Sequence, residues 1–116
     1  MNKRNIGSNY EEKAAVYLEE LGYKILKRNF RCRMGEIDIV AKEGRYLVFL
    51  EVKYRSGSKK GTAPEAVDIR KQIIICKVAQ YYLWQHHYST DTPCRFDVLG
   101  VTENDIELIR DAFEYR

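Results

Sequence analysis

Residues 35–55 read GEIDIVAKEGRYLVFLEVKYR and predict two β-strands joined by a tight turn. We expect Glu43 and Gly44 to form the turn, because glycine readily adopts the positive φ that tight hairpin turns require. This turn decides which residues pair, and it predicts one continuous apolar face that forms a wall of the core. The pairs on that face are Ile37 with Leu50, Ile39 with Val48, and Ala41 with Tyr46.

Polar side chains gather on the opposite face of the predicted hairpin. There Asp38 becomes the diagonal neighbour of Glu51, and Lys53 becomes the diagonal neighbour of Glu36. Diagonal Cα atoms in an antiparallel pair lie roughly 7–8 Å apart, so two carboxylates placed in this way can reach one ion. A slip by one residue would put Asp38 and Glu51 on different faces, so the apolar face also fixes this polar arrangement.

Two carboxylates and a lysine on one face suit metal-dependent hydrolysis of a phosphodiester. Magnesium prefers oxygen ligands and is often held by one or two carboxylates. We therefore expect Asp38 and Glu51 to bind Mg²⁺ or Mn²⁺, with the carbonyl of Val52 as a further ligand. Lys53 would position the attacking water and offset developing charge, and Glu36 would be a second-metal ligand or a water positioner. The alternative is a solvated strand face, because Glu-x-Lys on a strand is common by chance.

A helix is predicted before the hairpin. Ser8 and Glu11 form a capping box that marks its start, Gly22 ends it, and residues 1–7 are expected to be a frayed tail. Glu11 lies at the edge of the apolar side of this helix. It is either the capping partner of Ser8 or a third carboxylate that leans toward the hairpin, and spacing alone favours the capping role.

The other predicted elements complete an α/β fold. They are an edge strand over residues 23–31, a helix from about Pro64 to Trp84, a strand over 95–101, and a short strand with a frayed end after it. The predicted order is helix, three strands, helix and strand. A helix between two strands implies a parallel pair, so we expect a mixed sheet flanked by helices. Asp97 could line the site or bond a neighbouring loop, and the structural role is favoured; His86 and His87 are expected at the surface.

Bulk composition limits the class of protein. The chain has 116 residues, 45% hydrophobic and 32% charged, which predicts one globular domain over residues 1–116. No apolar run approaches the roughly 20 residues of a membrane span, and the first residues lack the apolar region of a secretory signal. Three widely separated cysteines without a C-x-x-C motif argue against a disulfide framework and a zinc site, and favour the cytoplasm.

Basic side chains flank the hairpin, although the net charge is only +3. One cluster holds Lys24, Lys27, Arg28, Arg31 and Arg33, and the other holds Lys53, Arg55, Lys59 and Lys60. Such clusters beside an acidic site suit a polyanion, and the residues expected to contact nucleic acid are Arg55, Lys59, Lys60 and Lys71. Ordinary solvated surface is the alternative for each cluster and for the helix residue Lys71.

Four motifs resemble the YraN-type bacterial family. They are G-x-x-x-E-x-x-A-A-x-Y-L at 7–18, GEIDIVA at 35–41, VFLEVKYR at 48–55 and RFDV at 95–98. The combination of Asp38 with Glu51-Val52-Lys53 also resembles the PD-(D/E)XK nuclease superfamily, and the YraN-type family is similar to archaeal Holliday-junction resolvases. Ile37 stands where the superfamily signature has proline, which many superfamily members also lack.

The resemblance implies a restriction-endonuclease-like fold with a metal-dependent nuclease site. It implies that Asp38, Glu51 and Lys53 form the core of this site, and that Glu11 matches a helix glutamate associated with it. The expected activity is that of an endonuclease acting on DNA, with branched or damaged DNA as candidate substrates. The alternative is a nucleic-acid-binding module with the same fold that does not cleave. A homodimer through residues 73–75 is compatible with either function.

Overall fold

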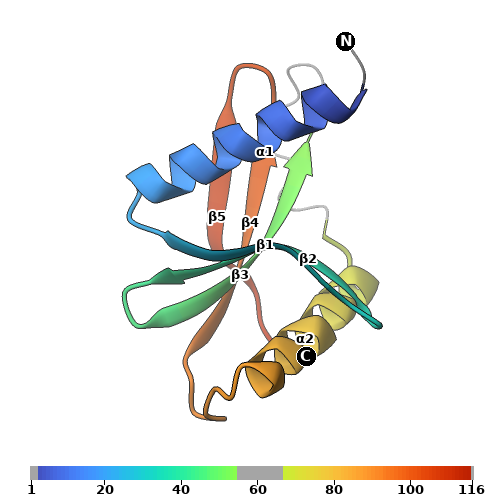
Figure 1. Ribbon diagram of the computed structural model, residues 1–116, viewed down its shortest axis with the longest axis vertical. Helices are drawn as coiled ribbons and strands as arrows, with labels where there is room; N and C mark the ends of the chain where they lie inside the picture. Colours follow the sequence, from blue (N-terminus) through green and yellow to red (C-terminus); the bar gives the residue numbers. More distant parts are fainter. Residues whose placement is uncertain (1–2, 55–66, 116) are drawn as a thin grey trace.

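The computed structural model of the chain describes residues 3–54 and 67–115. Helices and strands follow one another along this part of the chain (Figure 1). They are α1 (Lys3–Glu20), β1 (Lys24–Cys32), β2 (Gly35–Glu43), β3 (Tyr46–Tyr54), α2 (Ile69–Gln85), β4 (Cys94–Val101) and β5 (Ile106–Phe113). The predicted order of helix, three strands, helix and strand is confirmed, and β5 confirms the short strand that was predicted to follow it.

The five strands form one mixed sheet in the order β1-β2-β3-β4-β5. Strands β1 and β2, β2 and β3, and β4 and β5 pair antiparallel, whereas β3 and β4 pair parallel. The predicted parallel crossover through the second helix and the predicted edge position of β1 are therefore confirmed. In Figure 1, α1 lies above the region where the strands cross and α2 lies below it.

The turn between β2 and β3 lies one residue later than predicted. Gly44 occupies the first loop position with φ of 58°, and Glu43 pairs with Tyr46. Glycine at the first loop position is typical of a II′ turn, whose twist matches that of the flanking strands. The predicted pairing is therefore wrong by two positions, since Ile39 faces Leu50. A slip of two residues still leaves each side chain on the same face of the strand pair.

Both faces of the sheet are buried, each under one helix. The cluster on the α1 side includes Ala14, Leu18, Ile39, Ala41, Val48, Leu50 and Val52. The cluster on the α2 side includes Ile37, Val40, Leu47, Phe49, Val78 and Tyr82. The predicted common face of Ile37 and Ile39 is thus wrong, because the two side chains enter different clusters. The regular alternation of side chains between the two faces of the sheet is therefore broken in β2 at Asp38, between Ile37 and Ile39.

Helix α1 begins at Lys3, so the predicted start at Ser8 and the predicted frayed tail over residues 3–7 are wrong. A capping box favours a helix start without enforcing one, because a serine within a helix costs only about 0.5 kcal/mol relative to alanine. The predicted end is confirmed, since Gly22 follows the last turn with φ of 98°.

Helix α2 begins at Ile69 rather than near Pro64, which lies outside the described residues. Asp68 is its N-cap, and the Asp68 side chain accepts a hydrogen bond of 2.8 Å from the backbone N–H of Lys71. Aspartate at this position satisfies a backbone donor that the helix itself leaves unpaired. The predicted end near Trp84 is confirmed.

One side of α2 is buried. Its buried residues are Ile75, Cys76, Val78, Ala79 and Tyr82, whereas Ile69 and Ile73 are exposed. The helix packs closely against β2, since a Cβ added to Gly35 would lie 2.7 Å from Cγ2 of Ile74. Glycine at position 35 therefore lets α2 approach the start of the strand that carries Asp38.

Neither α1 nor α2 combines the length and the apolar character that a membrane crossing requires, as far as residues 3–54 and 67–115 are concerned.

Candidate active site

Asp38 and Glu51 lie where the ladder between β2 and β3 ends. The last pair of that ladder is Ile39 with Leu50, so Asp38 and Glu51 are the first residues beyond it on the two strands. Asp38 Oδ2 accepts a hydrogen bond of 2.7 Å from the backbone N–H of Val52. This bond holds the Asp38 carboxylate against β3, beside the Glu51 side chain.

The two carboxyl groups share a partly dry environment. Burial is the largest effect on Asp38 and raises its pKa, while the hydrogen bond from Val52 opposes that rise. Burial, followed by the charge of Asp38, raises the pKa of Glu51 to about 7, although Lys71 and Lys53 act to lower it. The Glu51 side chain is only 13% exposed. Two carboxylates in such surroundings disfavour each other's charge, so a proton or a shared cation stabilises the pair.

A lysine from α2 approaches this pair. Lys71 Nζ lies 3.8 Å from Glu51 Oε1, and its side chain is 47% exposed. The sequence placed Lys71 near the site as a phosphate contact, but it gave no sign of an ion pair with Glu51. The contact depends on how α2 packs over the sheet. Lys71 therefore brings one positive charge to the carboxylates and remains accessible to solvent.

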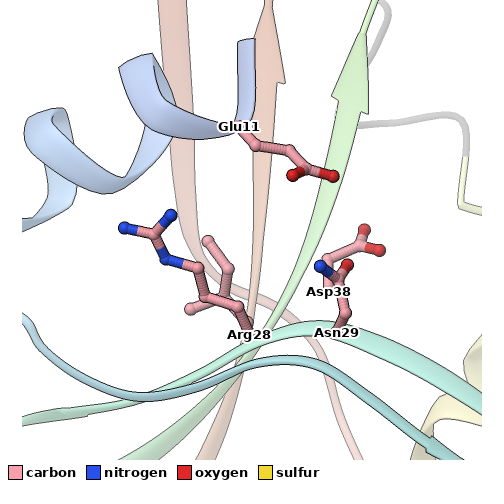
Figure 2. Close-up of a pocket in the computed structure, with 5 residues that line it drawn as sticks. Glu11, Arg28, Asn29 and Asp38 are labelled. Carbon is pink, nitrogen blue, oxygen red and sulfur yellow. The ribbon is translucent and has the colours of Figure 1, made fainter. Parts of the chain in front are cut away.

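Glu11 joins the site from α1. A small pocket between α1 and the sheet is lined by Glu11, Arg28, Asn29, Asp38 and Ile39. Figure 2 shows the Glu11 carboxylate extending from the helix toward the Asp38 side chain. The structure thus places Glu11 at the site, as the family resemblance implied. Its predicted capping role does not apply, because α1 starts well before Ser8.

Asn29 and Tyr54 belong to this site but were missed in the sequence. Asn29 lies on β1 between Arg28 and Phe30, whose partners on β2 flank Asp38, and it has φ of 53°. Burial and then the charges of Glu11 and Asp38 raise the pKa of the Tyr54 hydroxyl, which indicates that these groups are near one another. Asparagine tolerates the left-handed conformation, but nothing in the sequence marks Asn29 as a residue that adopts it. Tyr54 could have been found, since it directly follows Lys53.

Glu36 and Lys53, the other two predicted residues of the hairpin site, differ in how they interact with Asp38 and Glu51. Glu36 forms an ion pair with Arg31 on β1, and the Glu36 charge contributes to the raised pKa of Asp38. Its carboxylate is thus engaged at the β1 side of the hairpin. Lys53 lies two residues after Glu51 on β3, is half-buried, and acts to lower the pKa of Glu51. Of the two, Lys53 has the closer electrostatic link to Glu51.

The remaining predicted site residues are not all placed. Arg55, Lys59 and Lys60 lie outside the described residues. Within residues 3–54 and 67–115, no group of three or more His, Cys, Asp or Glu side chains is arranged to hold a metal ion. The donors that the described part of the chain offers near a cation are therefore the two carboxylates of Asp38 and Glu51, with backbone oxygen beside them.

Asp97 forms a separate buried network. It is fully buried, and its carboxylate accepts hydrogen bonds from Tyr23 Oη at 2.7 Å and from Arg95 Nε at 2.9 Å. The backbone N–H of Asp111 donates a further bond of 2.9 Å. Arg95 also bonds Glu43 at 2.6 Å. Asp97 thus ties β4 to β5, to the start of β1 and to the end of β2, as the favoured structural role predicts.

Comparison with known proteins identifies the family. Among curated proteins, a UPF0102 protein of Lachnoclostridium phytofermentans is 53% identical over 114 residues, covering 98% of this chain and 97% of the relative. A UPF0102 protein of Caldicellulosiruptor saccharolyticus is 46% identical, covering 97% and 100%. The model of the uncharacterised protein family UPF0102 matches residues 10–101, which span α1 to β4 and so include Glu11, Asp38, Glu51 and Asp97. The chain therefore belongs to the uncharacterised protein family UPF0102.

Proposed function

We propose that the chain is a magnesium- or manganese-dependent nuclease that hydrolyses phosphodiester bonds, with DNA, including branched or damaged DNA, as the first substrate to test. The observation that carries this proposal is the Asp38–Glu51 pair. Two opposed carboxylates, one with its pKa raised to about 7, stand at the end of a strand pair with a lysine nearby. Groups with strongly shifted pKa values cluster at functional sites more often than elsewhere.

The donors fit a hard divalent cation. One Asp38 oxygen is engaged by the Val52 N–H, which leaves the other oxygen and the Glu51 carboxylate as ligands, and the Val52 carbonyl is a further candidate. Magnesium is held by such small oxygen sets together with water. When bound, the ion would supply Lewis acidity and an activated water. The repulsion between the two carboxylates in the metal-free chain supports this assignment.

Other side chains of the site have separate roles in the proposal. Lys53 would orient the attacking water and offset the negative charge that develops on the phosphate. Glu11, which faces Asp38 across the pocket, would hold a water by hydrogen bonding. Tyr54 would donate a hydrogen bond from its hydroxyl, and burial with the nearby Glu11 and Asp38 raises its pKa, so that it stays protonated above neutral pH as well.

The same arrangement supports placing the fold in the restriction-endonuclease-like class and the site in the PD-(D/E)XK superfamily. An acid on β2, a Glu-x-Lys on β3 and a glutamate on the preceding helix meet at one place. Strand β3 then pairs parallel with β4. Similarity to archaeal Holliday-junction resolvases remains part of this proposal, and cleavage of a four-way junction would call for two copies of the site, as in a homodimer.

One observation favours the second candidate, a nucleic-acid-binding module that does not cleave. Lys71 already lies 3.8 Å from Glu51. A lysine that stays at this position would offset part of the negative charge of the pair without a metal. The two candidates therefore differ in whether a divalent cation binds beside Lys71.

A cleavage screen tests the proposal. The full chain is incubated with Mg²⁺ or Mn²⁺ and with labelled single-stranded, duplex, flapped and four-way DNA, and with RNA. We expect cleavage that EDTA stops and that Asp38→Asn and Glu51→Gln abolish. Cleavage that persists in both variants would reveal a contaminating nuclease. Calorimetry without binding of either metal would overturn the nuclease function and leave the binding module.

A further inference from the structure

A groove runs between the edge strand β1 and the C-terminal end of α2. It consists of two adjoining hollows of about 560 Å³ and about 460 Å³, within the range of ligand pockets. Phe30, Arg31 and Gln85 line both hollows, which makes them continuous. The other residues that line it are Lys27, Asn29, Cys32, Arg33, Met34, Tyr81 and His86.

The groove is positively charged. Lys27 and Arg31 lie on β1 and Arg33 lies in the turn that follows it, and among the residues that the structure describes no Asp or Glu lines either hollow. Arg31 forms an ion pair with Glu36, yet its side chain remains 74% exposed. Cations along a groove attract a phosphate backbone and release its counterions on binding. The charge of this surface therefore matches a polyanion.

Two aromatic rings of α2 lie at or beside the groove. Tyr81 lines it, and Trp84 lies next to Tyr81, with 5.7 Å between the two rings. Trp84 is 72% exposed, the most exposed of the large hydrophobic side chains described, although tryptophan is usually well covered. Proteins that bind single-stranded nucleic acid combine a basic groove with aromatic rings on which unpaired bases stack.

The groove and the pocket of the candidate active site meet at one residue. Asn29 lines the groove and also lines the pocket that contains Glu11 and Asp38. We propose that the groove binds a single-stranded segment of nucleic acid, with phosphates on Lys27 and Arg33 and a base on Trp84, and directs it past Asn29 to Asp38. This inference builds on the proposed function, because it names the form of the substrate that the same site would reach.

A peptide strand added to the edge of β1 is the competing occupant. The edge disfavours it, because closely spaced basic side chains on an edge strand hinder strand addition. The register shift between Ile25 and Lys27 also breaks the regular ladder on which an added strand would depend. A single-stranded nucleic acid matches both features of the groove, because its phosphates pair with the basic side chains and its bases stack on the aromatic rings.

Trp84 provides a direct test, because it is the one tryptophan of the chain. The full chain in EDTA, where no metal-dependent cleavage occurs, is titrated with unlabelled 20-nucleotide single-stranded DNA, single-stranded RNA and duplex DNA. We expect saturable quenching of Trp84 fluorescence by single strands and weaker quenching by the duplex. The two single strands distinguish DNA from RNA as the ligand. In parallel, the anisotropy of a labelled copy of the single strand gives the concentration at which binding saturates. Unchanged Trp84 fluorescence at that concentration would overturn the inference.

Charge variants locate the binding surface. Lys27→Gln with Arg33→Gln should weaken single-strand binding about tenfold and reduce the salt slope by about 1.4, the value for two phosphate contacts on a single strand. The matched control is Lys24→Gln with Lys42→Gln, two exposed and mutually paired lysines on the same strand pair. The control should weaken binding at most about twofold. An equal loss of affinity in both double variants would show that the single strand is attracted by the overall positive charge. It would overturn the proposal that the groove is the binding surface.

The outcomes separate the groove from the proposed function. Quenching of Trp84 together with a complete lack of cleavage in either metal would retain the groove and overturn the nuclease. The opposite result is also possible: the wild-type chain and the Lys27→Gln, Arg33→Gln variant cleave at the same rate, and single strands leave Trp84 fluorescence unchanged. That result would retain the nuclease function and overturn nucleic-acid binding in the groove.

Discussion

Lys71 Nζ on α2 lies 3.8 Å from Glu51 Oε1 on β3, so the helix that crosses between β3 and β4 supplies a cation to the carboxylate pair. The ammonium group and a divalent cation would compete for the same negative charge. This competition makes Lys71 the residue that best separates a cleaving protein from a binding module.

Replacing Lys71 by Met should raise the pKa of Glu51 further, because Lys71 acts to lower it. At pH 8 the same variant should bind Mg²⁺ about fivefold more tightly, since unit charges about 4 Å apart interact by roughly 1 kcal/mol even in bulk water. Isothermal calorimetry measures the affinity, and Lys77→Met on the exposed side of the same helix is the control. Unchanged or weaker Mg²⁺ binding in Lys71→Met alone would show that Lys71 does not compete with the ion.

Stability should depend on pH through Glu51. Its pKa is raised from 4.5 to about 7, so the folded chain holds this proton more tightly than the unfolded chain does. The stabilisation is complete below the ordinary pKa and is lost as the pH rises through 7. A shift of this size corresponds to about 3 kcal/mol. Urea unfolding in EDTA between pH 4.5 and 8 should show the decline, and Glu51→Gln should flatten most of it.

Substitutions of Asp38 should separate its charge from its hydrogen bond. Asp38→Asn keeps an oxygen that can accept from the Val52 N–H and removes the repulsion of Glu51, so its free energy of unfolding at pH 8 should at least equal that of the wild type. Asp38→Ala leaves the Val52 N–H without this acceptor and should be less stable than Asp38→Asn by about 1–3 kcal/mol. Denaturant unfolding gives both values. Equal stabilities would mean that water replaces the lost bond.

Asp97 should matter for folding and not for metal binding. Its removal in Asp97→Ala leaves the buried Arg95 with fewer partners, and breaking a buried ion pair typically costs about 3–5 kcal/mol. Tyr23→Phe, which deletes one bond to Asp97, should cost about 1 kcal/mol. Urea unfolding measures both losses, and calorimetry on the milder Tyr23→Phe should give wild-type Mg²⁺ affinity. Loss of metal binding in that folded variant would place the Asp97 network in the active site.

The period-two pattern of the hairpin predicted most of the candidate site. The pattern assigned Asp38, Glu51 and Lys53 to one face, and despite the error of two residues in the pairing, Asp38 and Glu51 lie side by side just beyond the last pair of the ladder. The sheet wall was predicted less well. Ile37 was expected beside Ile39, and local pattern could not reveal that β2 changes its facing at Asp38.

Contacts between distant elements were not predictable in the same way. The approach of Lys71 to Glu51, the position of Glu11 across from Asp38, and the groove between β1 and α2 all depend on where the helices pack. The helix starts were also misplaced. The capping signal at Ser8 competes with a helix that continues through it, and the Asp68 cap was overlooked in favour of Pro64.

At the end of the ladder between β2 and β3, position 38 has a second role that position 51 does not share. The Asp38 side chain takes the place of a main-chain carbonyl for Val52, just beyond the last regular pair of the ladder. A relative without the proposed catalysis would still need an acceptor at this position to guide the path of β3, whereas its Glu51 would be under no such demand. Retention of glutamate at position 51, rather than of aspartate at 38, is therefore the sharper test of the proposed chemistry among the relatives of this chain.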